Sequence, residues 1–117
     1  MVAIIKILLP LQHEELSYEG VWVKELCGNI GEINNLPVFT REYKFGDVIE
    51  FDPVTYKAMQ VIRDGGYTPT EIIGYRDRFA DEKTKWEAEG YVVEGIEKGK
   101  VAITRKYRER DGYTHAV

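Results

Sequence analysis

The chain contains only one cysteine, Cys27, among its 117 residues. A single thiol excludes an internal disulfide framework and a cysteine-rich zinc site, and it fits a reducing compartment. Histidine and serine are nearly as scarce, because the chain has 2 His, His13 and His115, and Ser17 is its one serine. Neither histidine lies in a recognisable nucleophile motif, so we expect no serine- or cysteine-based catalytic set and a protein that is not an enzyme.

Long apolar runs are also missing. The longest apolar stretch spans residues 2–10 and is interrupted by Lys6, whereas a membrane helix needs ~20 apolar residues. The chain start lacks the basic segment and the small-residue cleavage site of a signal peptide. We therefore expect a soluble, cytoplasmic protein.

Cofactor and metal motifs are absent as well. The sequence has no glycine-rich dinucleotide or phosphate loop, no His-Glu-x-x-His zinc motif and no aspartate-rich calcium loop. One cysteine and two distant histidines are too few soft ligands for a zinc site. We expect neither a cofactor nor metal dependence.

The residues that are present describe a globular protein. Hydrophobic residues make up 44% of the chain and charged residues 31%, with 8 Tyr, 4 Phe and 2 Trp. This composition excludes disorder throughout the chain, and the length suits one domain. We expect a single α+β domain over residues 1–110 and a frayed C-terminal tail over residues 111–117.

Short β-rich segments separated by turn residues dominate the first half of the chain. Gly, Asn, Pro and Asp mark the turns between them, as in hairpin connections. We expect strands at residues 3–9, 21–26, 32–39, 48–51 and 56–63. Their spacing predicts a small curved antiparallel β-sheet or partial barrel of about five strands.

Residues 68–75 allow two interpretations. Thr68-Pro69-Thr70-Glu71 has the form of a helix-capping box. Glu71–Tyr75, in contrast, is β-branched and would pair back across the turn at residues 64–66 as a strand. We favour the strand, because Gly74 would weaken a helix interior by ~1 kcal/mol relative to alanine.

One helix and a C-terminal hairpin complete the predicted fold. We expect the helix over residues 78–89, with Asp77 as N-cap and Gly90 at its C-terminal end. Strands over residues 91–96 and 100–107 should form the hairpin. One core is expected to unite the following side chains: Trp22, Phe39, Val48, Phe51, Ile62, Phe79 and Trp86.

Three segments, residues 21–26, 33–39 and 45–50, resemble in order the bacterial family called domain of unknown function 4265. The family has a strand with Trp, then a Leu-Asp-Asn-Ile-Pro-Phe-Phe-like segment, then Gly-Asp-Val-Val-Glu. Asn34 stands here in place of the acid and Val38 in place of an aromatic residue. The matching residues are Asn35, Pro37, Phe39, Gly46, Asp47, Val48 and Glu50.

The resemblance covers residues 3–75 and implies an α+β layout rather than a function. The family continues with Arg and a Ser-Gly-His-Ser-Thr-like turn, of which Arg63, one glycine and Thr68 match. Tyr67 stands where the family has histidine. If that histidine were catalytic in the family, this chain would lack the activity. The resemblance also favours a strand over residues 68–75.

Charge is distributed unevenly along the chain. The net charge of −4 lies in the first 60 residues, while residues 61–117 are balanced. A pI near 5.2 argues against nonspecific nucleic-acid binding. Whether the basic stretch over residues 98–110 binds an anion stays open.

Three functions remain compatible with these observations. The first is a protein-binding module, an immunity- or antitoxin-type inhibitor whose acidic surface is attracted to a basic toxin domain. The second is a sensor of a small molecule or nucleotide, and the third is a small carboxylate-dependent enzyme. We favour the inhibitor. Its expected partner-binding residues are Glu14, Glu15 and Glu19 in one loop and Asp64 and Tyr67 in a second turn.

Overall fold

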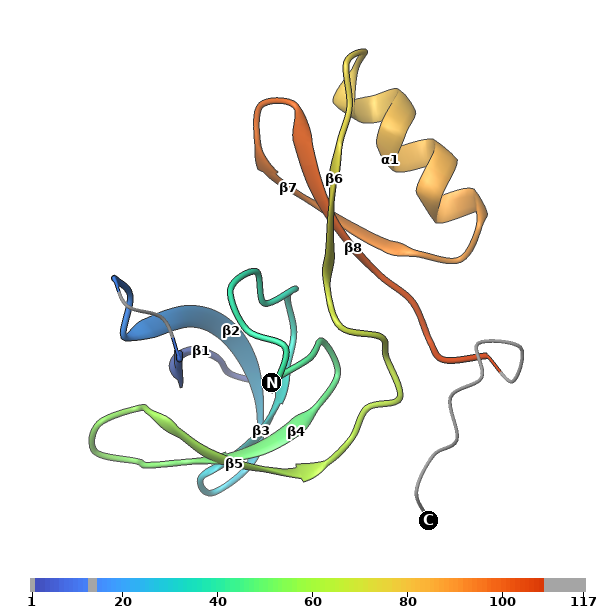
Figure 1. Cartoon of the computed structure of the whole chain (residues 1–117). Helices are drawn as coiled ribbons and strands as arrows, with labels where there is room; N and C mark the ends of the chain where they lie inside the picture. Colours follow the sequence, from blue (N-terminus) through green and yellow to red (C-terminus); the bar gives the residue numbers. More distant parts are fainter. Residues whose placement is uncertain (1, 13–14, 109–117) are drawn as a thin grey trace.

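The computed structural model describes residues 2–12 and 15–108, which fold into two antiparallel sheets and one helix (Figure 1). The larger sheet has five strands and the smaller has three. The elements are β1 (Ile4–Pro10), β2 (Tyr18–Cys27), β3 (Ile30–Ile33), β4 (Val48–Phe51), β5 (Ala58–Arg63), β6 (Glu71–Gly74), α1 (Phe79–Ala88), β7 (Val92–Glu97) and β8 (Lys100–Thr104). This architecture confirms the predicted α+β class, with a small sheet followed by a strand, a helix and a hairpin.

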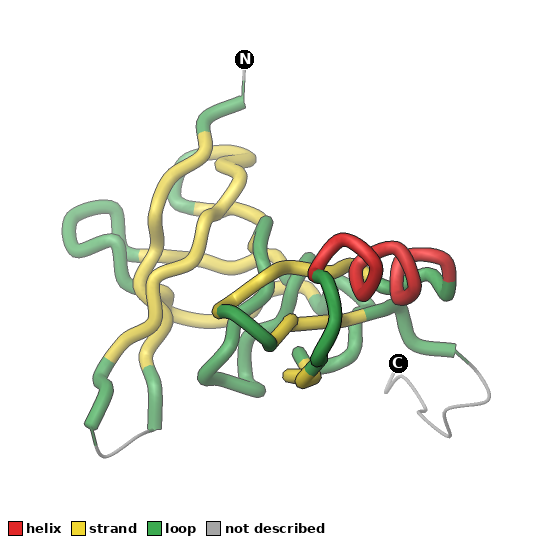
Figure 2. The backbone as a smooth tube through the Cα atoms, turned by 90° about the horizontal axis from the view of Figure 1, so that it is seen from above, coloured by secondary structure: helices red, strands yellow, loops and turns green. Residues whose placement is uncertain are grey.

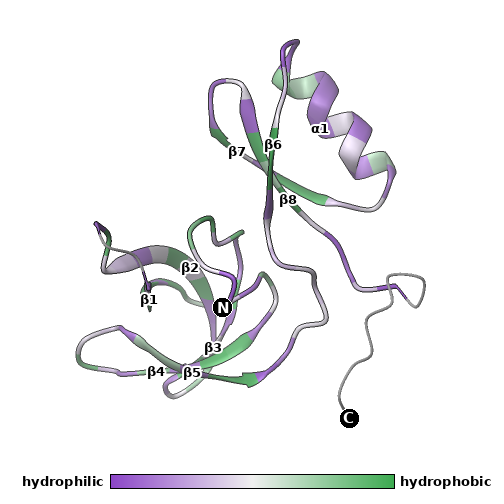
Figure 3. Cartoon of the chain, in the orientation of Figure 1, coloured by the Kyte–Doolittle hydropathy of each residue, from purple (hydrophilic) through white to green (hydrophobic). Residues whose placement is uncertain are grey.

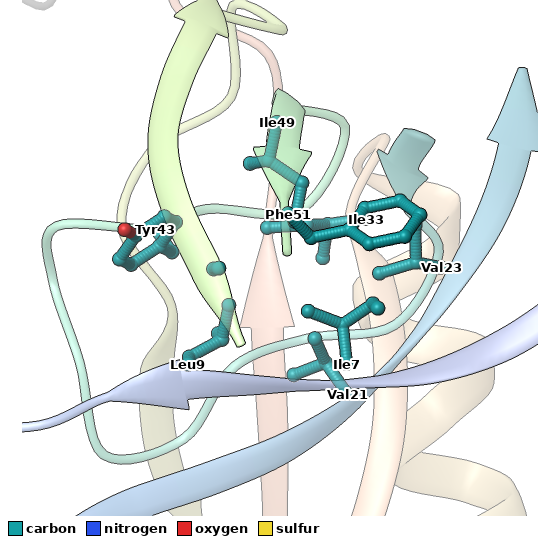
Figure 4. Close-up of a cluster of buried hydrophobic side chains, with 9 residues drawn as sticks. Ile7, Leu9, Val21, Val23, Ile33, Tyr43, Ile49 and Phe51 are labelled. Atoms are coloured by element: carbon teal, nitrogen blue, oxygen red, sulfur yellow. The ribbon is translucent and has the colours of Figure 1, made fainter. Parts of the chain in front are cut away.

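The five-stranded sheet follows the order of the chain, so each strand pairs with the next. Ile7 of β1 lies opposite Val21 of β2, and both side chains are at most 1% exposed. Alternation along each strand turns such residues to one side of the sheet. Together they form the first core: Ile7, Leu9, Val21, Val23, Ile33, Tyr43, Ile49, Phe51 and Ala58 (Figure 4).

The large sheet curls until its two edge strands meet at one point. Leu8 of β1 and Lys57 form an isolated parallel bridge, and the Leu8 N–H donates to the Tyr56 carbonyl at 2.8 Å. Beyond this bridge the edges separate, and five of the six residues of β5 are exposed. The sheet is therefore a partial barrel that does not close.

The three-stranded sheet has the order β6-β8-β7, with α1 lying against one of its faces (Figure 2). Val93, Val101 and Ile103 form the buried centre of a second core. Trp86 of α1 packs against this centre, although α1 itself has no fully buried residue. Figure 3 shows α1 mainly in purple and white, with light green near its two ends, so the helix is largely hydrophilic.

The predicted strand at residues 68–75 is confirmed as β6, but its predicted pairing back across the turn at residues 64–66 is wrong, because β6 pairs with β8. Its four residues pair with β8 in antiparallel register, from Glu71 opposite Ile103 to Gly74 opposite Lys100. Thr68 does not cap a helix, because its hydroxyl lies 3.1 Å from the Thr104 hydroxyl and bonds there instead. Pairing with a buried strand thus outweighs the local capping signal.

The predicted helix is also present, with a shifted start. Arg78, rather than Asp77, is the N-cap, and its side chain makes no capping hydrogen bond. Gly90 follows the helix with φ +92, the left-handed conformation that a helix C-terminus favours in glycine. The expected tail over residues 111–117 lies outside the described residues.

The prediction of a single core is wrong. Trp22 lies between Val21 and Val23 in β2, and strand alternation turns its side chain to the outer face, where 51% of it is exposed. Lys6 covers the ring, with Nζ 5.7 Å from the ring centre. Val48 and Phe51 are buried as predicted, and Trp86 packs on the second core. The remaining predicted members are exposed: Phe39, Ile62 and Phe79.

A core side chain and a side chain on the outer face predict different costs of truncation. Phe51 is 2% exposed, so Phe51→Ala should lower the free energy of unfolding by about 3–5 kcal/mol. Trp22→Ala removes a half-exposed ring and should cost at most about 1 kcal/mol. Urea denaturation of both variants measures the difference, and equal losses would contradict the assignment of Trp22 to the outer face.

Candidate functional site

A crevice separates the small sheet from the loop that connects β3 and β4. The face of the small sheet that α1 does not cover carries Ile72, Ala102 and Glu94 in one row across the strands. Leu36, in the connecting loop, is 1% exposed and donates its N–H to Glu94 Oε1 at 3.1 Å. This contact joins the loop to the sheet.

Beyond that contact the crevice is open and largely apolar. Its volume is about 580 Å³. Phe39 is its most exposed apolar side chain, at 59%, and Ile72 and Ile96 face it from the small sheet with 41% and 36% exposed. The full lining is Glu19, Val38, Phe39, Ile72, Ile96, Glu97 and Lys100.

Glu19 holds the loop that presents Phe39. Its carboxylate accepts the N–H of Val38 at 2.6 Å and the N–H of Phe39 at 2.8 Å. Hydrogen bonds to a charged acceptor are stronger than those between neutral groups. The backbone of Phe39 is thus fixed from β2 while the aromatic ring remains exposed.

Glu94 is the titratable group at the contact between the Leu36 loop and the small sheet. Burial raises the pKa of its carboxyl above the ordinary value, and the hydrogen bond from the Leu36 N–H opposes this shift. Removal from water disfavours the charged form, which accounts for the direction.

The predicted acidic loop is shorter than expected. Glu14 lies outside the described residues, and Glu15 is exposed. Glu19 belongs to β2 rather than to a loop, because Leu9 pairs opposite it. The carboxylate of Glu19 is occupied by backbone donors, so it serves as an anchor for the Phe39 loop.

The second predicted place, the turn at residues 64–67, packs against a buried carboxylate. Asp47 is 1% exposed, and it accepts the N–H of Lys44 at 3.0 Å and the N–H of Gly65 at 2.9 Å. Its two oxygens therefore join the turn before β4 to the turn after β5. Burial raises the pKa of Asp47, although these two hydrogen bonds act in the opposite direction.

The side chains of Asp64 and Tyr67 both take part in this junction. Asp64 accepts Lys44 Nζ at 2.7 Å and the Gly66 N–H at 2.6 Å. The Tyr67 ring meets Phe45 edge-on at 4.8 Å between centroids and lies under Lys106 Nζ at 5.3 Å. Tyr67 is half-buried by these contacts, and its role as an interface anchor stays a prediction.

The two predicted places do not form one site. Glu19 lines the crevice between the sheets, whereas Asp64 and Tyr67 line a separate polar hollow with Arg63 and Lys106. The structure brings Phe39, Ile72 and Ile96 together instead. Their exposure along one crevice was not predicted, because aromatic and β-branched residues in such segments are usually buried.

The part of the chain that the structure describes contains no group of three or more His, Cys, Asp or Glu side chains arranged to hold a metal ion. No helix within it is long and apolar enough to cross a membrane.

The raised pKa of Asp47 predicts the pH dependence of stability. The folded protein holds this proton more tightly than the unfolded chain, whose Asp titrates near 3.8. The contribution of Asp47 is therefore fully present below that value and declines as the pH rises through the raised pKa. Asp47→Asn lacks this titration and can accept only one of the two N–H groups, which should cost about 1–3 kcal/mol.

We expect the stability difference between wild type and Asp47→Asn to shrink as the pH rises through this interval. Urea denaturation at a series of pH values measures it. A difference that grows with pH would show that the charged form of Asp47 is the favoured one in the folded state.

The close approach of two glycines at the junction gives another prediction. A Cβ at Gly65 would collide with the Gly46 carbonyl, which is backbone and cannot move aside. Gly65→Ala should lower the free energy of unfolding by about 2 kcal/mol or more. Gly74→Ala is the matched control, since its Cβ would meet nothing nearer than the Gly99 carbonyl at 3.9 Å. Equal melting temperatures of the two variants would contradict the close approach.

Comparison with known proteins finds no match to this chain among protein-family models, curated proteins or solved structures.

Proposed function

We propose that the protein is a non-enzymatic protein-binding module, an immunity- or antitoxin-type inhibitor of a basic bacterial toxin domain. The observation that supports this proposal is the crevice with Phe39 at its opening. An exposed aromatic side chain on an anchored backbone needs little ordering when a partner buries it. Interfaces concentrate their binding energy in such aromatic anchors.

The charge of the chain supports a basic partner. The net charge is −4, and all of it lies in the first 60 residues, which include the Phe39 loop. An acidic surface accelerates encounter with a basic domain and suppresses encounter with acidic ones. Glu15, which is exposed, would act on the association rate together with Glu14. The encounter would take place in the cytoplasm, in keeping with the single cysteine.

The resemblance to the domain of unknown function 4265 is part of the same proposal. Two of the matching residues, Gly46 and Asp47, make the close approach and the buried hydrogen bonds that join the turn before β4 to the turn after β5. A family that shares them would share this junction. Membership would extend the architecture to those proteins without assigning them an activity.

The test of the proposal is partner capture with two matched variants. Phe39→Asp places a charge in the crevice, and Met59→Asp places one at an equally exposed position on β5, since both side chains are 59% exposed. Wild type and Met59→Asp should retain one stoichiometric partner from the source cells. Phe39→Asp should bind it more weakly by about 2 kcal/mol, roughly thirtyfold in Kd.

The captured partner is then expressed alone and together with wild-type protein. Growth arrest by the partner alone and rescue by wild type, but not by Phe39→Asp at equal expression, would support an inhibitor. Absence of a stoichiometric protein partner, with a small metabolite that raises the Tm of the wild type, would replace the proposal with the sensor function.

A further inference from the structure

A second hollow continues the crevice along the free edge of the small sheet. Its volume is about 460 Å³, and it shares Val38, Phe39 and Ile72 with the crevice. Thr70, Glu71 and Ile72 line one side. Successive side chains of a strand point to opposite faces, so a hollow that three consecutive residues line runs along the edge of the strand. Residues 38–41 form the opposite wall.

The edge that borders this hollow has backbone groups without strand partners. Within the described residues β6 pairs only with β8. The Tyr75 N–H donates to the Gly99 carbonyl at 2.8 Å, so residues 75 and 99 form a hydrogen-bonded pair. The Ile73–Val101 pair lies two residues earlier in the same register. Bonded and non-bonded pairs alternate along an antiparallel ladder. The backbone groups of Ile73 therefore point to β8, and those of Ile72 point to the hollow.

Polar groups in the hollow are also unpartnered. The Thr70 hydroxyl is buried and has no hydrogen-bond partner among the residues that the structure describes. Arg41 and Glu71 line the same hollow from opposite walls. Neither side chain makes an ion pair within residues 2–12 and 15–108. A ligand with one acidic and one basic group would complement both charges.

We propose that this groove binds an extended segment of a partner protein, which adds to β6 as a fourth strand of the small sheet. Backbone hydrogen bonds to Ile72 would hold the segment, as in other cases of strand addition. A large apolar side chain of the segment enters the crevice against Phe39 and Ile96. An acidic side chain faces Arg41 and a basic side chain faces Glu71. The inference rests on the proposed protein-binding function and specifies its mode.

The experiment uses random linear peptides displayed on phage and the full chain as bait, so it does not depend on the natural partner. Peptides that bind should combine one large apolar residue with one acidic and one basic residue. Amide hydrogen exchange followed by NMR then compares the free protein with its peptide complex. Exchange at the Ile72 N–H should slow by about tenfold or more on binding. The Ile73 N–H is the control in the same strand, because it already bonds to β8 in the free protein and should change little.

Charge reversal provides a second measurement that does not depend on amide hydrogen exchange. Arg41→Glu together with Glu71→Lys should weaken the selected peptide about tenfold or more, and a peptide with its two charges exchanged should recover the loss. Both side chains are exposed, so these substitutions should leave the fold intact. Peptide binding with unchanged exchange at Ile72, or no selected peptide at all, would overturn the inference.

The outcome is separable from that of the proposed function. Protection of Ile72 by peptides, without a toxin among captured proteins, would retain the groove and remove the inhibitor. A neutralised toxin that binds without protecting Ile72 would retain the inhibitor and remove strand addition.

Discussion

One buried carboxylate, that of Asp47, holds together two turns at one end of the large sheet. Asp47 bonds to backbone N–H groups on two separate turns, one before β4 and one after β5. The turns can approach this closely only because Gly46 and Gly65 meet there without side chains. Burying a carboxylate is costly unless hydrogen bonds compensate the loss of water. The buried position of Asp47 therefore depends on the two N–H donors, and the donors reach Asp47 only when the two turns lie close together. The link from β5 to β6 therefore leaves the large sheet in a defined direction.

Part of the small sheet stays open. The loop around Leu36 reaches one end of the face opposite α1 and is held there by Glu94. The other end, with Ile72 and Ile96, is left facing Phe39 across the crevice. A protein with two small cores thus exposes an apolar surface between them, where a larger single core would have buried it.

The strands and the helix could be predicted because their patterns are local. Alternating burial in β1 and β2, the Lys98-Gly99 turn between β7 and β8, and Gly90 after α1 are all visible over short spans of sequence. The side chains at the candidate site could not be predicted in the same way. The exposure of Phe39 depends on Glu19, which is 20 residues away in sequence and captures the Phe39 N–H. The packing of Tyr67 depends on Phe45 and Lys106, which are distant in sequence as well.

A short ribbon joins residues 66–68 to residues 105–107, which lie about forty residues apart in the sequence. The Tyr107 N–H bonds to the Gly66 carbonyl at 2.9 Å, and the Thr68 N–H bonds to the Arg105 carbonyl at 2.8 Å (Figure 1). During synthesis, the five-stranded sheet has all its strands once residue 63 has emerged from the ribosome, and such local pairings form early. The small sheet needs β8, which emerges about forty residues later. In each new chain, the strands of the large sheet are therefore complete before the crevice between the two sheets can form.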